Sequence, residues 1–162
     1  MTSENQPKKS SPTLWYVVAV VVIIVIIGVA VYVLTMRPGS TTPATVTMTL
    51  YEGEVSTTQY GFGNSASSLA SPGPTLTFKN GDVVQMTVYN VGTMPHSWAI
   101  STTPNTSGQI LFNSEINPGT YIAAGQSGTV TFTVNQAGSF YYVCPIPGHT
   151  DLGMYGSVTV NP

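Results

Sequence analysis

The sequence predicts an all-β fold, a Greek-key β-sandwich or barrel, preceded by one N-terminal transmembrane helix. Three observations predict it: an uncharged apolar run near the N-terminus, period-two alternation of apolar and polar residues along most of the remaining chain, and Gly, Asn and Pro residues between the alternating segments. The chain has 162 residues, which is enough for one domain beside the helix. No internal repeat and no pattern typical of a βαβ unit is evident.

The first element is the uncharged run over residues 14–36. As a helix that rises about 1.5 Å per residue, it is long enough to cross the hydrocarbon layer of a membrane. Lys8 and Lys9 precede the run and only Arg37 follows it, and positive side chains favour the cytoplasmic side. We therefore expect 1–13 to be cytoplasmic and 14–36 to be an uncleaved, single-pass anchor in the cell membrane, with the rest of the chain on the extracytoplasmic side.

Residues 37–44 contain two prolines and little that could pack, which predicts a linker. The outer domain is predicted over 45–162, where about seven alternating segments each bury one face. The inward-facing sets are Val46, Met48 and Leu50; Leu76 and Phe78; Val84, Met86 and Val88; Val130, Phe132 and Val134; Phe140, Tyr142 and Cys144; and Val158 and Val160.

Asn80-Gly81 separates two of these segments and predicts a two-residue turn that joins them as an antiparallel hairpin, since both residue types tolerate positive φ. The stretches 53–74 and 102–120 are rich in Ser, Gly, Asn and Pro and are predicted to be loops or a short helix. Asn105 begins an Asn-Thr-Ser sequon for glycosylation, a pattern of low specificity.

The charge content excludes one class of partner. Only 6% of the residues are charged, and the basic side chains number four. They are Lys8, Lys9, Arg37 and Lys79. No surface could therefore neutralise a run of phosphates, so nucleic acid is excluded as a partner.

A metal site is predicted from a short motif at the end of one predicted strand. Cys144, the only cysteine, begins the sequence Cys-Pro-Ile-Pro-Gly-His149-Thr-Asp-Leu-Gly-Met154. A thiolate, an imidazole and a thioether suit copper and do not suit calcium or magnesium. His96, the only other histidine, follows the predicted strand 82–90. Two His, one Cys and an axial Met form the ligand set of blue-copper electron-transfer sites, so we predict one type 1 copper held by these four residues.

The ligand set also predicts a function. A rigid site that holds one geometry for both Cu(II) and Cu(I) lowers the reorganisation needed to exchange an electron. Four protein ligands leave no open position for a substrate, so we expect a carrier of single electrons and not an enzyme. The alternatives are a copper-delivery or storage protein with the same ligands, a zinc site, and a metal-free surface module in which each ligand has a purely structural role.

The residues over about 45–162 resemble the cupredoxins. The segment from Gly138 to Gly156 is similar to the copper loop of rusticyanin and of the archaeal sulfocyanins, and Pro95-His96-Ser97 resembles the motif of the first ligand. Many cupredoxins have Asn where this chain has Ser97, whereas the rusticyanin type has Ser. The chain departs from rusticyanin at Pro145, where rusticyanin has a polar residue.

The resemblance implies a two-sheet Greek-key fold with one type 1 copper. It also implies electron exchange through the exposed edge of His149, and a Ser97 hydroxyl or backbone that steadies the loop carrying Cys144. Membrane-anchored sulfocyanins serve respiratory chains, so the resemblance implies redox proteins of such a chain as donor and acceptor.

Overall fold

The computed structural model describes residues 12–35 and 46–162. The chain divides into two compact units, Met1–Thr41 and Thr42–Pro162. The linker predicted over 37–44 and nearly all of the predicted cytoplasmic segment lie outside the described residues.

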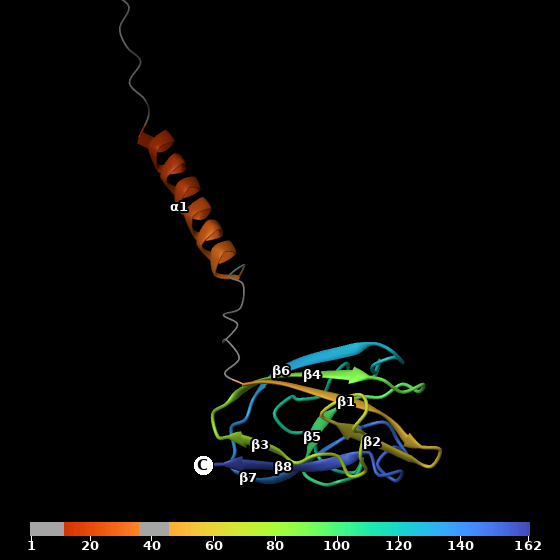
Figure 1. Cartoon of the computed structure of the whole chain (residues 1–162). Coiled ribbons are helices and arrows are strands. Elements are labelled where there is room, and N and C mark those ends of the chain that lie inside the picture. The colour runs from red at the N-terminus through yellow and green to blue at the C-terminus, as the bar shows by residue number, and fades with distance from the viewer. Residues whose placement is uncertain (1–11, 36–45) are drawn as a thin grey trace, which may run out of the picture. The chain divides into compact units, whose positions relative to one another are not determined.

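The first unit contains helix α1, Pro12–Thr35, of 24 residues (Figure 1). It covers nearly the same residues as the predicted apolar helix. Side chains of α1 are described for Thr13 and for 15–26. Among the residues described, no helix has the length and apolarity that a membrane span requires.

The second unit is built of strands, as predicted, and those described form two four-stranded sheets (Figure 1). In spatial order, the first sheet consists of β2 (Gln59–Gly63), β1 (Val46–Ser56), β4 (Val83–Asn90) and β6 (Ser127–Thr133). The second consists of β3 (Leu76–Lys79), β8 (Tyr155–Asn161), β7 (Gly138–Val143) and β5 (Ala99–Ser101). β1 pairs with β4 and β3 with β8 in parallel, and the other pairs are antiparallel.

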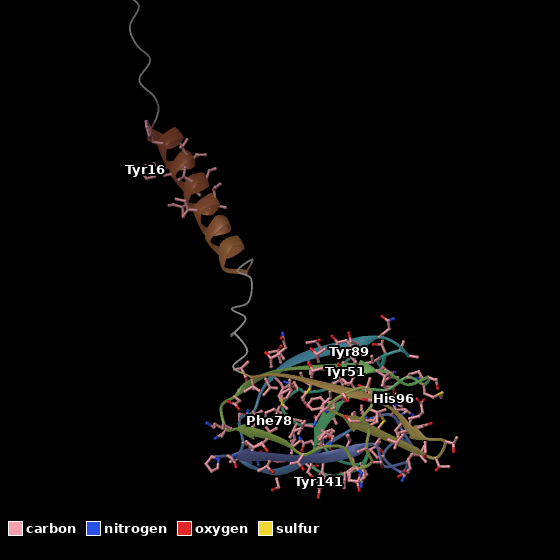
Figure 2. The ribbon with its side chains drawn as sticks, viewed as in Figure 1. Tyr16, Tyr51, Phe78, Tyr89, His96 and Tyr141 are labelled. Atoms are coloured by element: carbon pink, nitrogen blue, oxygen red, sulfur yellow. The ribbon has the colours of Figure 1, made fainter. Side chains whose placement is uncertain are left out.

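The alternation in the sequence decides which side chains fill the space between the sheets (Figure 2). Val84, Met86 and Val88 of β4 are fully buried. The other residues of the predicted inward sets are buried too, except Val46, Met48 and Val130, which are partly buried and pack against the core. Trp98 lies in the same core, with ring centroids 5.8 Å from Phe132 and 6.1 Å from Tyr142. Burying these apolar surfaces, at roughly 25 cal/mol per Å², is the main force that holds the two sheets together.

The predicted hairpin at Asn80-Gly81 is wrong. β3 and β4 lie in different sheets, so the turn between them crosses from one layer to the other. The turn residues hydrogen-bond to the ends of other strands, with Asn80 N donating to Asn161 O and Gly81 N to Val134 O. Gly81 has positive φ, as the turn residue type predicts, but a turn type alone does not determine which strands pair.

Part of the predicted loop 53–74 is also wrong, because β1 continues to Ser56 and β2 follows it as an antiparallel partner. Glycines hide this strand in the sequence by interrupting its alternation. They are required by close backbone packing, because a Cβ on Gly61 would collide with the carbonyl oxygen of Ala70. β5 was not predicted either, and it has only three residues. The predicted loop over 102–120 consists of turns and bends with one isolated bridge, as expected.

Candidate metal centre

The fold brings together predicted ligands from two distant parts of the sequence. His96 lies in the loop after β4 and is held by two backbone hydrogen bonds, His96 N to Ile122 O at 3.1 Å and Ile122 N to His96 O at 2.7 Å. Cys144 directly follows β7, and Met154 directly precedes β8. The two strands are neighbours, and Cys144 N donates to Met154 O at 3.1 Å. The ladder of β7 and β8 therefore fixes both ends of the loop that carries His149.

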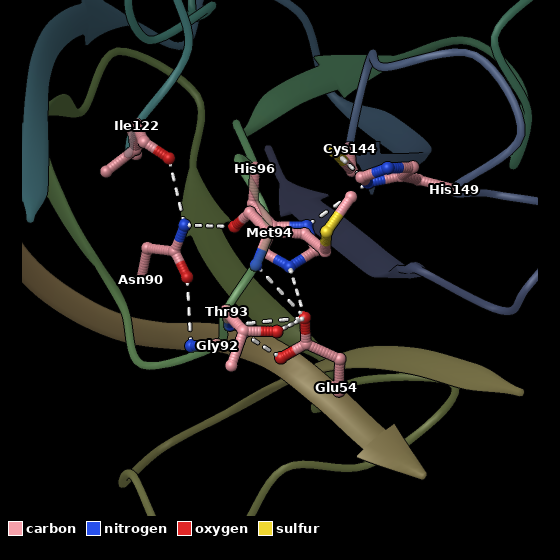
Figure 3. A network of polar contacts seen from close by, with 9 residues as sticks. All are labelled: Glu54, Asn90, Gly92, Thr93, Met94, His96, Ile122, Cys144 and His149. Atoms are coloured by element: carbon pink, nitrogen blue, oxygen red, sulfur yellow. Dashed lines mark hydrogen bonds and ion pairs between the residues drawn. The ribbon is translucent and has the colours of Figure 1, made fainter. Parts of the chain in front are cut away.

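The donor atoms of three predicted ligands converge (Figure 3). Nδ1 of His96 lies 3.1 Å from Nδ1 of His149, and Sγ of Cys144 lies 3.4 Å from the same His149 nitrogen. All three ligand atoms lie within 4.8 Å of one another. His96 and Cys144 are fully buried, whereas His149 is partly exposed.

These spacings fit a single transition-metal ion. Two nitrogens about 2.0–2.1 Å from one ion lie about 3.1–3.5 Å apart at near-tetrahedral angles, and a sulfur about 2.3 Å from the ion gives a similar separation. The chemistry of the donor set agrees, because two imidazoles and a thiolate are ligands of copper and zinc.

Met154 is fully buried at the same end of the domain. Its backbone N donates to His149 O at 3.1 Å, and its carbonyl accepts from Cys144. Its main chain is thus tied to two of the three converging residues.

The protonation states of the metal-free site suit metal binding. Burial, and then the charge of His149, lower the pKa of His96 to about 4, although Glu54 acts in the opposite direction. Burial likewise lowers the pKa of His149, again against Glu54. Both imidazoles are therefore neutral near pH 7, as metal ligation requires.

The Cys144 thiol is different, because burial raises its pKa to about 12. Backbone N–H groups of Ile146 and Ser97 hydrogen-bond to it and oppose this rise, while the carboxylate of Glu52 adds to it. A metal ion must therefore displace the thiol proton, and the two N–H groups would then stabilise the thiolate.

The contact from Ser97 agrees with the expectation that its backbone supports Cys144. Its hydroxyl donates elsewhere, to Ile116 O at 2.6 Å. Ile146, directly after Pro145, supplies an N–H that Pro145 itself lacks.

A carboxylate that the sequence analysis did not single out lies behind His96 (Figure 3). Glu54 Oε1 is 4.0 Å from His96 Nε2, which has no hydrogen-bond partner among the described residues. The same carboxylate accepts hydrogen bonds from Thr93 N, Thr93 Oγ1 and Met94 N, at 3.0 to 3.2 Å. Glu54 thus holds the loop that carries His96 and places a negative charge beside the ring.

Asn90 holds the other side of this loop. Its side-chain nitrogen donates to Met94 O at 2.8 Å and to Ile122 O at 2.9 Å, and its side-chain oxygen accepts from Gly92 N at 2.9 Å. In the sequence, Glu54 and Asn90 stand out only as polar residues within apolar or threonine-rich strands. That pattern does not reveal what their side chains contact.

Two four-stranded sheets, with a buried cluster of two histidines and a cysteine at the strand ends, define a protein of the cupredoxin class. Residues 58–161 match the model of the copper binding proteins of the plastocyanin/azurin family. The chain therefore belongs to this family, and its cofactor is one type 1 copper.

Individual relatives match over parts of their length. The chain is 32% identical over 93 residues to the copper-resistant cuproprotein CopI of Rubrivivax gelatinosus, a match that covers 53% of this chain and 56% of CopI. It is 37% identical over 59 residues to auracyanin-B of Chloroflexus aurantiacus, covering 36% of this chain and 23% of auracyanin-B. The chain therefore spans about half the length of the first relative and about a quarter of the second.

Solved structures agree on the fold. Auracyanin B superposes with a TM-score of 0.53 at 18% identity, over 75% of this chain and 92% of auracyanin B. The multicopper oxidase mgLAC gives a TM-score of 0.55 at 24% identity, over 72% of this chain and 39% of the oxidase.

Proposed function

We propose that this chain is a carrier of single electrons whose type 1 copper is held by His96, Cys144, His149 and Met154. The observation that carries the proposal is the convergence of His96 Nδ1, His149 Nδ1 and Cys144 Sγ, at spacings of 3.1 and 3.4 Å. Copper supplies one-electron chemistry when bound, and the residues supply a fixed geometry.

The rigidity of the site supports transfer of electrons over bond-making catalysis. Cys144 and Met154 are held by the ladder of β7 and β8, and His96 by its bridge to Ile122. With four protein donors, no position is left for a substrate, so the protein acts as a carrier and not as an enzyme. His149 is more exposed than the other three ligands, and electrons enter and leave through its ring.

The experiment is an absorption spectrum of the full-length chain with added Cu(II), repeated with Cys144→Ser. We expect the intense blue band that arises from charge transfer between a thiolate and Cu(II), and its loss in the variant. Met154→Leu tests the axial ligand: the band should persist while the reduction potential rises. A folded, copper-loaded protein without the band would count against the proposal and favour a zinc or structural site.

Membrane anchoring through residues 14–36 is part of the proposal. It is supported by the absence of charge in that stretch and by Lys8 and Lys9 before it. We expect the full-length chain to sediment with membranes and resist alkaline extraction, with the copper domain on the extracytoplasmic side, whereas residues 42–162 should be released. Extraction of the full-length chain by alkali would contradict the anchor.

The partners are proposed to be redox proteins of a respiratory chain. The similarity of the segment around Cys144, His149 and Met154 to sulfocyanins and rusticyanin supports this assignment. It would be contradicted if the reduced protein failed to pass electrons to any terminal oxidase of the membranes in which the chain resides.

Copper delivery or storage is the second candidate, and the similarity to a copper-resistant cuproprotein favours it. A delivery protein must release its ion. Transfer of Cu(I) to a chelator within minutes would support delivery, whereas retention over hours together with rapid electron exchange would support the carrier.

A further inference from the structure

Glu52 is a carboxyl group in the core that the ligand set does not use. It lies on β1, is 0% exposed, and is in register with Phe62 of β2 and Asn90 of β4. Neither of its carboxyl oxygens has a hydrogen-bond partner among the described residues. A buried carboxylate without a partner is costly, so the position favours the neutral, protonated form.

The residues beside Glu52 are already committed to other contacts. Both amide hydrogens of Asn90 are donated to backbone carbonyls, those of Met94 and Ile122. Phe62 offers only an aromatic ring, and the Tyr142 hydroxyl donates to Pro74 O at 2.7 Å. No ion pair to Glu52 is found within residues 12–35 and 46–162, and burial raises the pKa of its carboxyl to about 8.

Titratable side chains lie on the strands of both sheets and in the loops that follow them. Tyr60 lies on β2, Tyr142 on β7, Cys144 and His149 follow β7, His96 follows β4, and Glu54 is two residues further along β1. Within β4 and β6, the only titratable side chain is Tyr89 of β4, which is exposed. Asn90, which is in register with Glu52, donates to the carbonyls of Met94 and Ile122, and Ile122 is the backbone partner of His96. Glu52 therefore lies at the same end of β4 as the metal centre.

Glu52 and the metal centre interact electrostatically. A negative charge on Glu52 raises the pKa of the Cys144 thiol. The interaction is reciprocal, so a more negative metal centre must favour the protonated form of Glu52. Cu(II) with one thiolate would carry a net charge of plus one, which favours the ionised form of Glu52, and reduction would lower that charge to zero.

We propose that Glu52 is a redox-linked proton site, through which this protein carries a proton together with its electron. On reduction, a donor redox protein gives one electron to the copper centre, and the carboxylate of Glu52 takes one proton from solvent to form its O–H bond. On oxidation, the electron passes to the acceptor and the proton returns to solvent. The inference rests on the proposed electron-carrier function and extends it.

The test is the reduction potential of the full-length, copper-loaded chain measured by potentiometric titration at pH values around and below 8. A linked proton makes the reduction potential fall as the pH rises, by at most about 59 mV for each tenfold change in proton concentration. The potential should be constant at pH values below and above the range in which Glu52 titrates. Glu52→Gln should remove the dependence and keep the blue band. Asp82→Asn is the matched control, because it removes one carboxylate at the opposite end of β4 from Asn90 and should behave like the wild type.

A second measurement needs no variant. Infrared difference spectra of the wild type should show the C=O band of a protonated carboxyl group appearing on reduction, and hydrogen–deuterium exchange should shift this band. A pH dependence that persists in Glu52→Gln, or that disappears in Glu54→Gln instead, would overturn the inference, as would the absence of the infrared band. A blue protein with a pH-independent potential would contradict this inference alone, whereas a protein without the blue band would contradict the proposed function as well.

Discussion

Glu54 is the residue whose contacts bear most directly on one of the proposed ligands. Its carboxylate accepts three hydrogen bonds from the loop that carries His96, and it lies 4.0 Å from the outer nitrogen of that ring. Burial opposes ionisation, but the hydrogen bonds from its own backbone and from Thr93 lower the pKa of Glu54 below its usual value. Outer carboxylates of this kind orient ligating histidines and tune the metal.

We expect Glu54→Gln to raise the reduction potential, on the order of tens of millivolts, because it removes a partly exposed negative charge that stabilises the oxidised centre. The blue band should remain, since all four proposed ligands are retained. Potentiometry at one fixed pH checks this, with Asp82→Asn as the control. An unchanged potential would mean that the charge of Glu54 is screened by solvent.

Glu52 makes a separate prediction about the metal-free protein. Because its folded pKa of about 8 exceeds the value of 4.5 for an exposed group, the folded state binds more protons between these pH values. The stability from Glu52 is therefore fully present below about pH 4.5 and is lost as the pH rises towards 8, by at most about 1.4 kcal/mol per pH unit. Glu52→Gln should flatten this slope.

Urea unfolding of both apoproteins across this range measures the difference. His96 contributes the opposite trend, because its lowered pKa makes the folded state bind fewer protons between about pH 4 and 6.5. His149 contributes in the same direction as His96, and both histidines are present in the wild type and in the variant, so the difference between the two curves isolates Glu52. Parallel curves for the wild type and the variant would show that the carboxyl group is solvated in solution.

At the scale of elements, the loop between β4 and Trp98 depends on Asn90 at the end of β4. The buried Asn90 amide hydrogen-bonds to Met94 O and Gly92 N in that loop and to Ile122 O in the segment beside it. Such a side chain substitutes for a strand partner where the chain leaves the sheet. It therefore determines where His96 lies relative to the loop after β7.

We expect Asn90→Ala to destabilise the protein by about 2–4 kcal/mol, because it leaves buried backbone groups unpaired, and to accelerate the loss of copper to a chelator. Thr87→Val on the same strand is the control, since the described side-chain hydrogen bond of Thr87, to Thr129 at 2.9 Å, is exposed and its loss should change stability little. Urea unfolding and chelator kinetics measure the two effects. Equal stability of the two variants would contradict the proposed role of Asn90.

For the whole molecule, the described core and the metal centre both belong to the unit Thr42–Pro162. The described core residues are numbered 46 and above. We therefore expect residues 42–162 alone to fold, to unfold at the same urea concentration as the second unit of the full-length chain, and to give the same copper spectrum. A lower midpoint for the truncated chain would show that the first unit contributes to stability.

Local sequence patterns predicted the inward faces of most strands and the ligand loop, because these features depend on residues that are close in the sequence. The spacing of Cys144, His149 and Met154 places three soft donors on one loop, and alternation identified the inward faces of most strands. β2 was missed because glycines that allow close backbone contact with 68–70 also erase alternation. The hairpin at Asn80-Gly81 was mistaken because pairing partners are not neighbours in the sequence.

The all-β class, most of the inward residues and the ligands that share one loop could be predicted from the amino-acid sequence alone, because each of these follows from side-chain chemistry at short spacing. The order of the strands, the approach of His96 to Cys144 and His149, and the contacts of Glu52, Glu54 and Asn90 became visible only in the folded chain. Strand pairing and burial depend on residues far apart in the chain. A carboxyl group acquires its charge and its role from the neighbours that folding brings to it.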